Sequence, residues 1–598
     1  MNGCIDCGVF LGNGSPVCPS LAREKESRRL ITSRRGPDSS NILSVEKNGF
    51  RLDMFSSVLQ IQGELLCHQP CESEGSESAL LWNGEYLNHP ASDRSDTALI
   101  LEKLVAGGNH VPTVLDSIEG PFAFVYFDSS SKQLWFGKDK VGRRSLLVSL
   151  ADDGNELSIS STALSGGNEV AAGEGIFSLC LTSGLISLHT WPKPVEFSSP
   201  KFLSGSSNYD IYQLKSHISS GILRHMQSLS IKSQLGILFS GGVDSVIIAS
   251  IAAEVVGDCP NITGIDLINV SCTNTTSSPD RCTGLVSYGE LLTTFPHINF
   301  RFICVDISET ELALVEDRIV QLAAPSNTLM DFNISCALWF GGRGEGLVLD
   351  SDFVRDADWP SIRQCIISEE STESANENRR SKKNPKLPPT VNGGCLECAV
   401  CTRRRPKPGC VLSACKHCCR DLSCIAHTPI RPKEVLNINA FVQRHKFENN
   451  IVKSDCRVLL VGHGADELFG GYGRHETKST KGGLEALRNE VLLDLGRLWQ
   501  RNLGRDDRIL GDSARDVRHP FLDESVIKFV GSLGVGALCS VDGQNKPILR
   551  ELARKTLGME IPASFRKRAI QFGTRIAQRT NIAKFGSHSR GSGTLVYQ

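Results

Sequence analysis

Hydrophobic and polar positions divide the chain into two regions with different periods. Up to about residue 200, short runs such as FRLDMFSSVLQIQG alternate apolar and polar residues, which is typical of strands with one buried face. SALLWNGEYL places Asn83-Gly84 between two apolar runs, and FAFVYFDSSSKQLWFG places a serine-rich turn between two aromatic runs. Both patterns predict hairpins, and successive hairpins predict antiparallel sheet.

From about residue 210 the apolar runs become short and continuous, and helical periods separate them. QLGILFS, GIDLINVSC, NFRFICVDI and CRVLLVGHG have the pattern of buried strands. VDSVIIASIAAEVVG and ETELALVEDRIVQLAA, which lie between them, have the pattern of helices. Strands that alternate with helices predict a parallel sheet that is buried on both faces.

A polar segment interrupts this second region. SEESTESANENRRSKKNPKLPPTVNGG is rich in Ser, Asn and Pro, which predicts a flexible linker. Because the strand pattern resumes afterwards, we interpret the segment as an insertion. The predicted organisation is a first domain over 1–200, a second domain over 210–350 and 451–580, a linker over 351–394, a cysteine-rich module over 395–430 and a disordered tail over 585–598.

Composition narrows the function classes. At 598 residues the chain is too long to fold around one hydrophobic core, so we expect a few domains. A formal net charge of -1 gives no global reason to expect nucleic-acid or membrane binding. No apolar run approaches the roughly 20 residues that cross a bilayer, and the N-terminus lacks the pattern of a secretory signal. We therefore expect a cytoplasmic protein, with the nucleus as the alternative.

Eight of the 22 cysteines lie in one 30-residue window with repeated two-residue spacing. Thiolates at this spacing bind tetrahedral zinc, so we predict structural Zn²⁺ there. The predicted ligands are Cys395, Cys398, Cys401, Cys410, Cys415, Cys418, Cys419, Cys424 and His427, with His417 as a further candidate for a second ion. The ligand pairing stays open, and an unliganded thiol-rich loop is the alternative. The basic runs RRSKK, in the linker, and RRRPKP, within the cluster, are solvated charge, a nuclear signal or an RNA contact. The cysteine-rich insertion is also a candidate site for a protein partner.

The first motif with chemistry is LGILFSGGVDS, an apolar strand that runs into Ser240-Gly241-Gly242 and then into a helix near Asp244-Ser245. Glycines that allow close approach, followed by free helix-terminal N–H groups, form an anion-binding cradle. The loop lacks the Gly-Lys-Ser/Thr of a Walker A motif and the spacing of a dinucleotide fingerprint. The alternative is a tight turn that binds nothing.

The second motif is VLLVGHGADELFGGYGRH, another strand followed by a glycine-broken turn, with Gly462, His463 and Gly464 before Asp466-Glu467. Taken alone, these two carboxylates are also explained as charges that the N-terminal dipole of a helix favours.

Together the motifs resemble those of the glutamine-hydrolysing asparagine synthetases, whose pyrophosphate loop reads SGGxDS and whose second ATP motif reads SGEGSDELFGGY. SSPDRCTG, RHPFLDESV and KPILRELA also fit that family, as do RRGPDSS, WNGEYLN, the Ser95-Asp96 pair and FGKDKVGRRSLL in the first half. The resemblance covers nearly the whole chain except the insertion and the tail. It implies an α+β N-terminal αββα sandwich of the type 2 glutamine amidotransferases, followed by an α/β ATP-pyrophosphatase (PP-loop, adenine nucleotide alpha hydrolase-like) domain.

The resemblance also implies site residues. ATP would bind Ser240, Gly241, Gly242, Asp244, Ser245, Gly462 and Gly464, with Mg²⁺ on Asp244 and Asp466. Amide formation would involve His463, which stands where the family has glutamate. It would also involve Lys567 and Arg568, which lie close in sequence to Ala569, the position where the family has lysine.

In the glutaminase half, the resemblance implies Cys4 as the nucleophile and Asn83 and Gly84 at the oxyanion hole. Glu85 and Asp96 would bind the amine of glutamine, and Gln60 replaces the arginine expected for its carboxylate. The family nucleophile is the first residue after Met removal and uses its own amine as base. Cys4 follows Met1-Asn2-Gly3, so its nitrogen is in a peptide bond, and the alternative is an inert thiol.

The leading hypothesis is an ATP-dependent amidoligase that adenylates a carboxylate, aspartate by resemblance, and amidates it. Its partners would be ATP, the carboxylate amino acid and, with the reservation about Cys4, glutamine. Three alternatives stay open: a non-catalytic zinc-containing binding or regulatory protein, a PP-loop enzyme acting on tRNA, and a ligase that uses another amine, as β-lactam synthetases do.

Overall fold

The computed structural model describes residues 2–11, 31–47, 49–89, 94–151, 156–163, 169–193, 209–272, 278–351, 354, 447–538 and 545–585. Residues Met1–Arg355 and Lys446–Gln598 form one compact unit. The predicted linker, the cysteine-rich module and the tail beyond Phe585 lie outside the described residues, so the predictions made for them stay predictions.

The N-terminal part is antiparallel, as its alternating pattern predicts. One group of strands contains β1 (Asn2–Leu11), β2 (Ser39–Lys47), β3 (Phe50–Leu59), β8 (Leu147–Leu150), β9 (Glu156–Ser160) and β10 (Val170–Ala171). The other contains β4 (Cys71–Glu72), β5 (Ala79–Gly84), β6 (Phe122–Asp128), β7 (Gln133–Lys138), β11 (Ile176–Cys180) and β12 (Ile186–His189). Between the groups, β1 pairs with β5 through Asn2 and Asn83.

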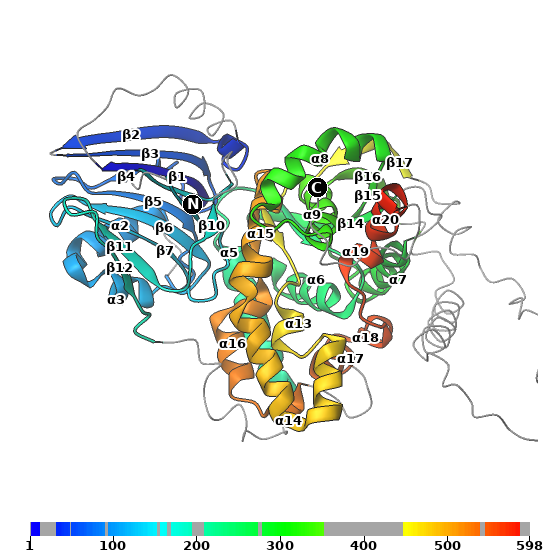
Figure 1. Cartoon of the computed structure of the whole chain (residues 1–598). Helices are drawn as coiled ribbons and strands as arrows, with labels where there is room; N and C mark the ends of the chain where they lie inside the picture. The colour runs from blue at the N-terminus through cyan, green and yellow to red at the C-terminus, as the bar shows by residue number, and fades with distance from the viewer. Residues whose placement is uncertain are drawn as a thin grey trace, which may run out of the picture. The chain divides into compact units, whose positions relative to one another are not determined.

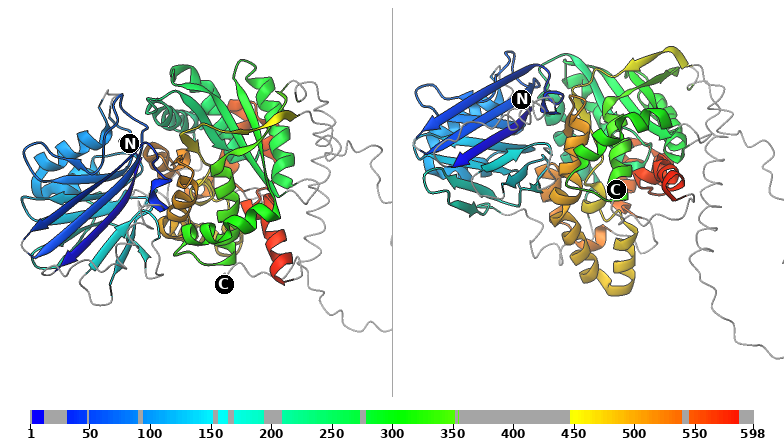
Figure 2. Two further views of the ribbon diagram at one scale, coloured as in Figure 1. Left: turned by 90° about the horizontal axis from the view of Figure 1, so that it is seen from above. Right: turned by 45° about the horizontal axis from the view of Figure 1, so that its top comes forward.

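The two groups of strands form two layers with an apolar core between them (Figure 1; Figure 2). Alternate side chains of β1 and β3, such as Val9 and Met54, pack there with Val125 and Phe127 of β6. The opposite face of β5–β7 is covered by α2 (Asp96–Gly107) and α3 (Val111–Asp116). The described residues therefore show one helical layer of the αββα sandwich that the resemblance implies, and the second layer stays a prediction.

One hairpin prediction is confirmed and the other is wrong. β6 and β7 pair across the serine-rich turn. Strand β5, however, ends at Gly84 and pairs with β6, which begins 38 positions later at Phe122. A Cβ on Gly84 would lie 2.5 Å from the Phe122 Cβ, so this glycine permits close approach of two strands and forms no hairpin turn.

The C-terminal part contains a seven-stranded sheet. Its strands are β13 (Ser233–Leu238), β14 (Ile262–Cys272), β15 (Phe300–Ile307), β16 (Glu345–Leu349), β17 (Phe447–Lys453), β18 (Val458–Leu460) and β19 (Asp516–Arg518). Their order is β17-β16-β15-β14-β13-β18-β19. Five of these strands, β15, β14, β13, β18 and β19, run parallel to one another. All four strands predicted from the apolar runs are present, which confirms the parallel sheet; β16 and β17 add an antiparallel edge.

The helices of this part are α5 (Ile211–Gln227), α6 (Val243–Val255), α7 (Pro279–Thr294), α8 (Glu309–Ala323), α9 (Leu329–Arg343), α13 (Ala465–Leu468), α14 (Gly473–Gly496), α15 (Gly504–Gly511), α16 (Glu524–Gly531), α17 (Pro547–Leu557), α18 (Glu560–Ser564), α19 (Ile570–Gly573) and α20 (Ile576–Phe585). Helices α6, α7, α9 and α15 pack against strands of the sheet, whereas α14, α16 and α17 lie away from it (Figure 1). Within the described ranges, no helix combines the length and apolar character needed to span a bilayer.

The strand order determines where a ligand can bind. β13 has β14 on one side and β18 on the other, so the chain leaves the carboxyl end of β13 at the point where the winding direction of the sheet reverses. In open parallel sheets, the crevice at such a reversal binds ligands. The two glycine-containing motifs follow β13 and β18, and the fold therefore brings them to the same edge.

Candidate functional site

The first loop runs from β13 into α6, and its backbone is held from outside. Gly241 has φ of +76°, and a Cβ on it would lie 2.3 Å from the backbone of Thr283. The Thr283 hydroxyl donates to the Ser240 carbonyl at 2.6 Å, and the Ser287 hydroxyl donates to the Gly241 carbonyl at 2.8 Å. Helix α6 begins after Gly242 with no side-chain cap. Its first N–H groups are therefore available to an anion.

The second loop runs from β18 into the short helix α13 and packs directly against the first. A Cβ on Gly462 would lie 3.1 Å from the Asp244 Cβ. Gly464 has φ of +87°, and a Cβ there would lie 2.4 Å from the Leu522 side chain. Glycine is required at Gly464 by both conformation and space, and Gly462 permits the two loops to touch.

Asp244 and Asp466 converge on one cation. The Lys546 ammonium lies 2.5 Å from a carboxylate oxygen of Asp244 and 2.6 Å from one of Asp466. The Lys546 side chain is 1% exposed and lies just before α17. Burial lowers the pKa of Lys546, but the two carboxylates outweigh burial and raise it. The two carboxylates thus lie close together around one buried ammonium.

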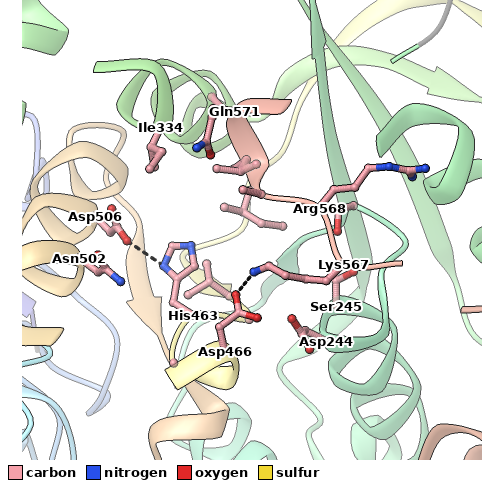
Figure 3. Close-up of a pocket in the computed structure, with 18 of the residues that line it drawn as sticks. Asp244, Ser245, Ile334, His463, Asp466, Asn502, Asp506, Lys567, Arg568 and Gln571 are labelled. Atoms are coloured by element: carbon pink, nitrogen blue, oxygen red, sulfur yellow. Dashed lines mark hydrogen bonds and ion pairs between the residues drawn. The ribbon is translucent and has the colours of Figure 1, made fainter. Parts of the chain in front are cut away.

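A second ammonium, that of Lys567, also contacts the Asp466 carboxylate (Figure 3). Burial raises the pKa of Asp466, but Lys546 and Lys567 together hold it well below its usual range. Asp466 is therefore ionised throughout the physiological range. Lys567 also lies over the Tyr472 ring, 5.0 Å from its centroid.

These groups line a cavity of about 330 Å³ at the carboxyl edge of the sheet. The predicted residues in its wall are Ser240, Asp244, Ser245, Gly462, His463, Gly464, Asp466, Lys567 and Arg568, and Ala569 also lies there. Gly242 lines a smaller adjoining cavity together with Lys546 and Arg568. The structure therefore brings the two motifs and the C-terminal lysine–arginine pair around one space, as expected.

His463 lies between the acidic pair and a further carboxylate from α15 (Figure 3). Its Nδ1 is 3.1 Å from Asp506 Oδ2, and its ring centre is 6.0 Å from that of His519. Burial raises the pKa of Asp506, but Arg505 and His463 lower it to about 2. Burial and His463 lower the pKa of His519 well below its usual range, so His519 is neutral. Asp506 and Lys546 are site residues that sequence reasoning did not identify.

Asp280, from the Pro-Asp pair noted in the sequence, lies in the same wall at the start of α7. Burial raises the pKa of Asp280 to about 7, against the opposing effect of Arg568 and Lys567. A Cβ on Gly573 would lie 2.0 Å from an Asp280 carboxylate oxygen, so the chain encloses this side chain closely.

The residues predicted for a glutamine pocket lie in the N-terminal domain. Asn83 and Gly84 end strand β5, and Glu85 follows them fully buried. A carboxylate oxygen of Glu85 is 3.0 Å from an Arg518 guanidinium nitrogen, and both side chains are 0% exposed. The two atoms do not have hydrogen-bond alignment, so the contact is an ion pair. The side-chain amide of Gln62 donates to the other Glu85 oxygen.

The other three predicted positions in this domain are also placed. Asp96 is buried at the start of α2, where its carboxylate accepts from the Thr97 N–H at 2.7 Å. The Gln60 amide donates to the Gly63 carbonyl at 3.2 Å. Cys4 lies in β1 with its Cα opposite that of Ser57.

The acidic pair fits a magnesium ion. Hard cations that bridge phosphates prefer carboxylate oxygens, and Asp244 and Asp466 already share one positive charge. In the described part of the chain, no group of three or more His, Cys, Asp or Glu side chains could hold a metal alone. The predicted zinc ligands lie outside that part.

Comparison with known proteins agrees with this architecture. A model of the glutamine amidotransferase domain family matches residues 58–165, and the asparagine synthase family matches residues 436–483 and 476–580. The chain is thus an amidotransferase-like domain joined to an asparagine synthase domain.

Over nearly its full length the chain is similar to curated proteins from several species. It is 25% identical to asparagine synthetase domain-containing protein 1 of Mus musculus, over 96% of this chain and 97% of that protein. It is 26% identical to an asparagine synthetase domain-containing protein of Saccharomyces cerevisiae, over 91% of this chain and 87% of that protein. A 79-residue stretch, 13% of this chain and 15% of the relative, is 44% identical to a putative glutamine-hydrolysing asparagine synthetase of Methanocaldococcus jannaschii. The chain is thus homologous over nearly its full length to proteins named asparagine synthetase domain-containing protein in several species.

Proposed function

We propose that this protein is an ATP-dependent ligase that adenylates a carboxylate and converts it to an amide. The convergence of Asp244 and Asp466 on one cation, beside the uncapped N-terminus of α6, is the observation that carries the proposal. Two carboxylates at a phosphate-binding loop are the arrangement expected for binding a magnesium–triphosphate complex. By resemblance, the carboxylate substrate is aspartate.

In the first step, a carboxylate oxygen attacks the α-phosphorus of ATP, the bond to the β-phosphate breaks, and pyrophosphate leaves. The SGG amides, Lys546, Lys567 and Arg568 surround this region with donors and positive charge, which stabilises the departing pyrophosphate. Magnesium, held by Asp244 and Asp466, would neutralise phosphate charge. The product is an acyl-adenylate enclosed in the 330 Å³ cavity.

In the second step, nitrogen attacks the acyl carbon, the bond to the AMP oxygen breaks, and the nitrogen loses a proton. His463 lies in the same wall, with Asp506 beside its Nδ1. A histidine oriented by a carboxylate is suited to accept that proton on its other nitrogen. We therefore assign His463 as the general base for amide formation, in the position where the family has a glutamate.

We propose ammonia or another small amine as the nitrogen donor, with hydrolysis of glutamine doubtful. In β1, the residue opposite Asn83, which was predicted for the oxyanion hole, is Asn2. The predicted nucleophile Cys4 lies two positions further along the strand. Glu85, expected to bind the amine of glutamine, faces the guanidinium of Arg518. Gln60 cannot form the charged pair that arginine would form with the glutamine carboxylate.

The alternative is a synthetase-like protein that binds partners without catalysis. It is favoured by the replacement of family residues at three positions, where Gln60, His463 and Ala569 now stand. In that case the cysteine-rich module, for which we propose structural zinc, would be the binding element.

ATP–pyrophosphate exchange separates the two functions. The purified chain is incubated with ATP, Mg²⁺ and labelled pyrophosphate across a panel of carboxylates that includes aspartate. The ligase incorporates label with at least one carboxylate, and Asp244→Ala abolishes the incorporation. If no carboxylate supports exchange while the chain is folded, the non-catalytic alternative is correct.

A further inference from the structure

The turn of helix that carries Asp506 has an unusual composition for its environment. All eight residues of α15, Gly504–Gly511 with the sequence GRDDRILG, are buried, including two arginines and two aspartates in succession. Charged side chains are rarely fully buried unless they are paired. Arg505, Asp506 and Asp507 are ion-paired, whereas Arg508 donates to the Leu322 and Ala323 carbonyls and to the Ser145 hydroxyl. These partners come from different parts of the fold.

Asp506 and Arg505 belong to the ATP pocket. Asp506 lies 3.1 Å from His463, and Arg505 lies 2.7 Å from Asp506. Arg505 also contacts Asp331 of α9 at 2.6 Å. The Asp506 carboxylate thus faces the His463 ring as an ion-pair partner without hydrogen-bond alignment, and the rest of α15 must hold it in place.

Asp507, the next residue, faces the N-terminal domain. The Arg35 guanidinium donates to the Asp507 carbonyl at 2.8 Å and to its carboxylate at 2.9 Å. Arg144 donates to the other carboxylate oxygen at 3.3 Å, and the Ser145 N–H donates to the first at 3.1 Å. Arg508 also contacts the N-terminal domain, because its guanidinium donates to the Ser145 hydroxyl at 2.9 Å.

The side chains in the contact between Asp507 and the two N-terminal arginines have little room to move. Arg35, Arg144 and Asp507 are 8%, 2% and 1% exposed, and a Cβ on Gly511 would lie 2.7 Å from the Arg35 guanidinium carbon. A buried charge in this setting cannot shift without leaving its partners unpaired. The position of the α15 backbone, and with it the direction of Asp506, is fixed from the N-terminal side.

We propose that the N-terminal domain, through Arg35 and Arg144, is a positioning element for His463: it anchors Asp507 and thereby orients Asp506 toward the histidine. The proposal rests on the ligase function, since His463 acts there in the nitrogen-transfer step. It assigns the amidotransferase-like domain a role that does not require it to hydrolyse glutamine. The adenylation step, which uses Asp244 and Asp466, does not depend on this contact.

The first test separates the two steps in Asp507→Asn, which keeps the shape of the side chain and removes its charge. Exchange of pyrophosphate is measured with the carboxylate identified for the wild type, and amide formation is measured with ammonium. The proposal predicts exchange within about twofold of wild type and amide formation reduced about 10- to 100-fold, since one oriented general base contributes about 10²–10⁴. Equal loss in both assays, or loss in neither, would overturn it.

Control variants decide whether the effect is specific. Glu119→Gln removes a different contact between the same domains, the 3.2 Å ion pair with Arg224, and should leave both assays unchanged. Arg35→Lys keeps the positive charge and should retain more amide formation than Arg35→Met. Amide formation that falls as far in Glu119→Gln as in Asp507→Asn would show general loosening of the interface and contradict the proposal.

The second test does not require any reaction. Histidine-labelled protein is compared by NMR as wild type and Asp507→Asn, with the His463 ring signal assigned by its loss in His463→Gln. The groups facing this ring are Asp506 and neutral His519. The proposal predicts a shift of the His463 signal in Asp507→Asn. An unchanged signal overturns the positioning role, whereas failure of the wild type to exchange pyrophosphate overturns the ligase function.

Discussion

Lys546 is an internal cation between the two carboxylates that we propose as magnesium ligands, so its replacement tests the site without nucleotide. In Lys546→Met the two partners of the ammonium, at 2.5 and 2.6 Å, are left facing each other. The distances place the Asp244 and Asp466 oxygens at most about 5 Å apart. Two unit charges at this separation repel by about 3 kcal/mol at an effective dielectric constant of about 20.

Lys567 still contacts Asp466 in the variant and offsets part of this repulsion. We therefore expect Lys546→Met to lose about 2–3 kcal/mol of unfolding free energy in the absence of divalent ions. Mg²⁺ should restore most of that loss, because it replaces the missing charge between the same oxygens.

The measurement is thermal unfolding with excess Mg²⁺ and with a chelator, for wild type and variant. The expected result is a Mg²⁺-dependent rise in the unfolding midpoint that is clearly larger in Lys546→Met than in wild type. Lys555→Met, which removes an exposed lysine paired with Glu551, is the matched control and should behave as wild type. Equal Mg²⁺ responses in wild type and Lys546→Met would refute the shared-cation geometry.

Three further variants address other parts of the pocket. Asp466→Asn should lower ATP–pyrophosphate exchange by about 10²–10³, the usual effect of losing one preorganised charge contact, whereas Asp455→Asn, which changes a carboxylate that is 67% exposed, should not. Gly241→Ala forces a Cβ to 2.3 Å from the Thr283 backbone at φ of +76°, so nucleotide binding measured by calorimetry should be lost. Because the pKa of Asp280 is raised to about 7, its contribution to stability is present at low pH and is lost as pH rises toward 7. Urea unfolding between about pH 5 and 8 should therefore show a smaller decline for Asp280→Asn than for wild type, and identical slopes would contradict the burial of Asp280 as an acid.

The sequence predicted those features that local pattern controls. Apolar runs that end in glycine identified β13 and β18, and the parallel order of the sheet then brings the ends of both strands together. The roles of the Asp244 and Asp466 carboxylates came from the resemblance of the two motifs after these runs to those of the asparagine synthetases. In these segments the local signal and the tertiary arrangement agree.

Other features depend on contacts between distant segments. Lys546 lies in the left-handed region, with φ of 56°, just before α17. The sequence identified this segment, KPILRELA, only through its resemblance to the asparagine synthetases. Asp506 belongs to the run RDDR, and such a run is ordinarily a solvated surface; here every member is buried against a partner far away in the sequence. The hairpin expected at Gly84 failed for the same reason, because a packing contact with Phe122 accounts for that glycine.

The most direct test of the account is calorimetric titration of ATP into the purified chain, with Mg²⁺ and with a chelator, repeated on Asp244→Ala. The account predicts saturable binding at one site in wild type that weakens strongly on removal of Mg²⁺, and at least about a tenfold loss of affinity in the folded variant, equivalent to about 1.4 kcal/mol. ATP binding that is absent from wild type, or that is the same with and without Mg²⁺ and in Asp244→Ala, would contradict it.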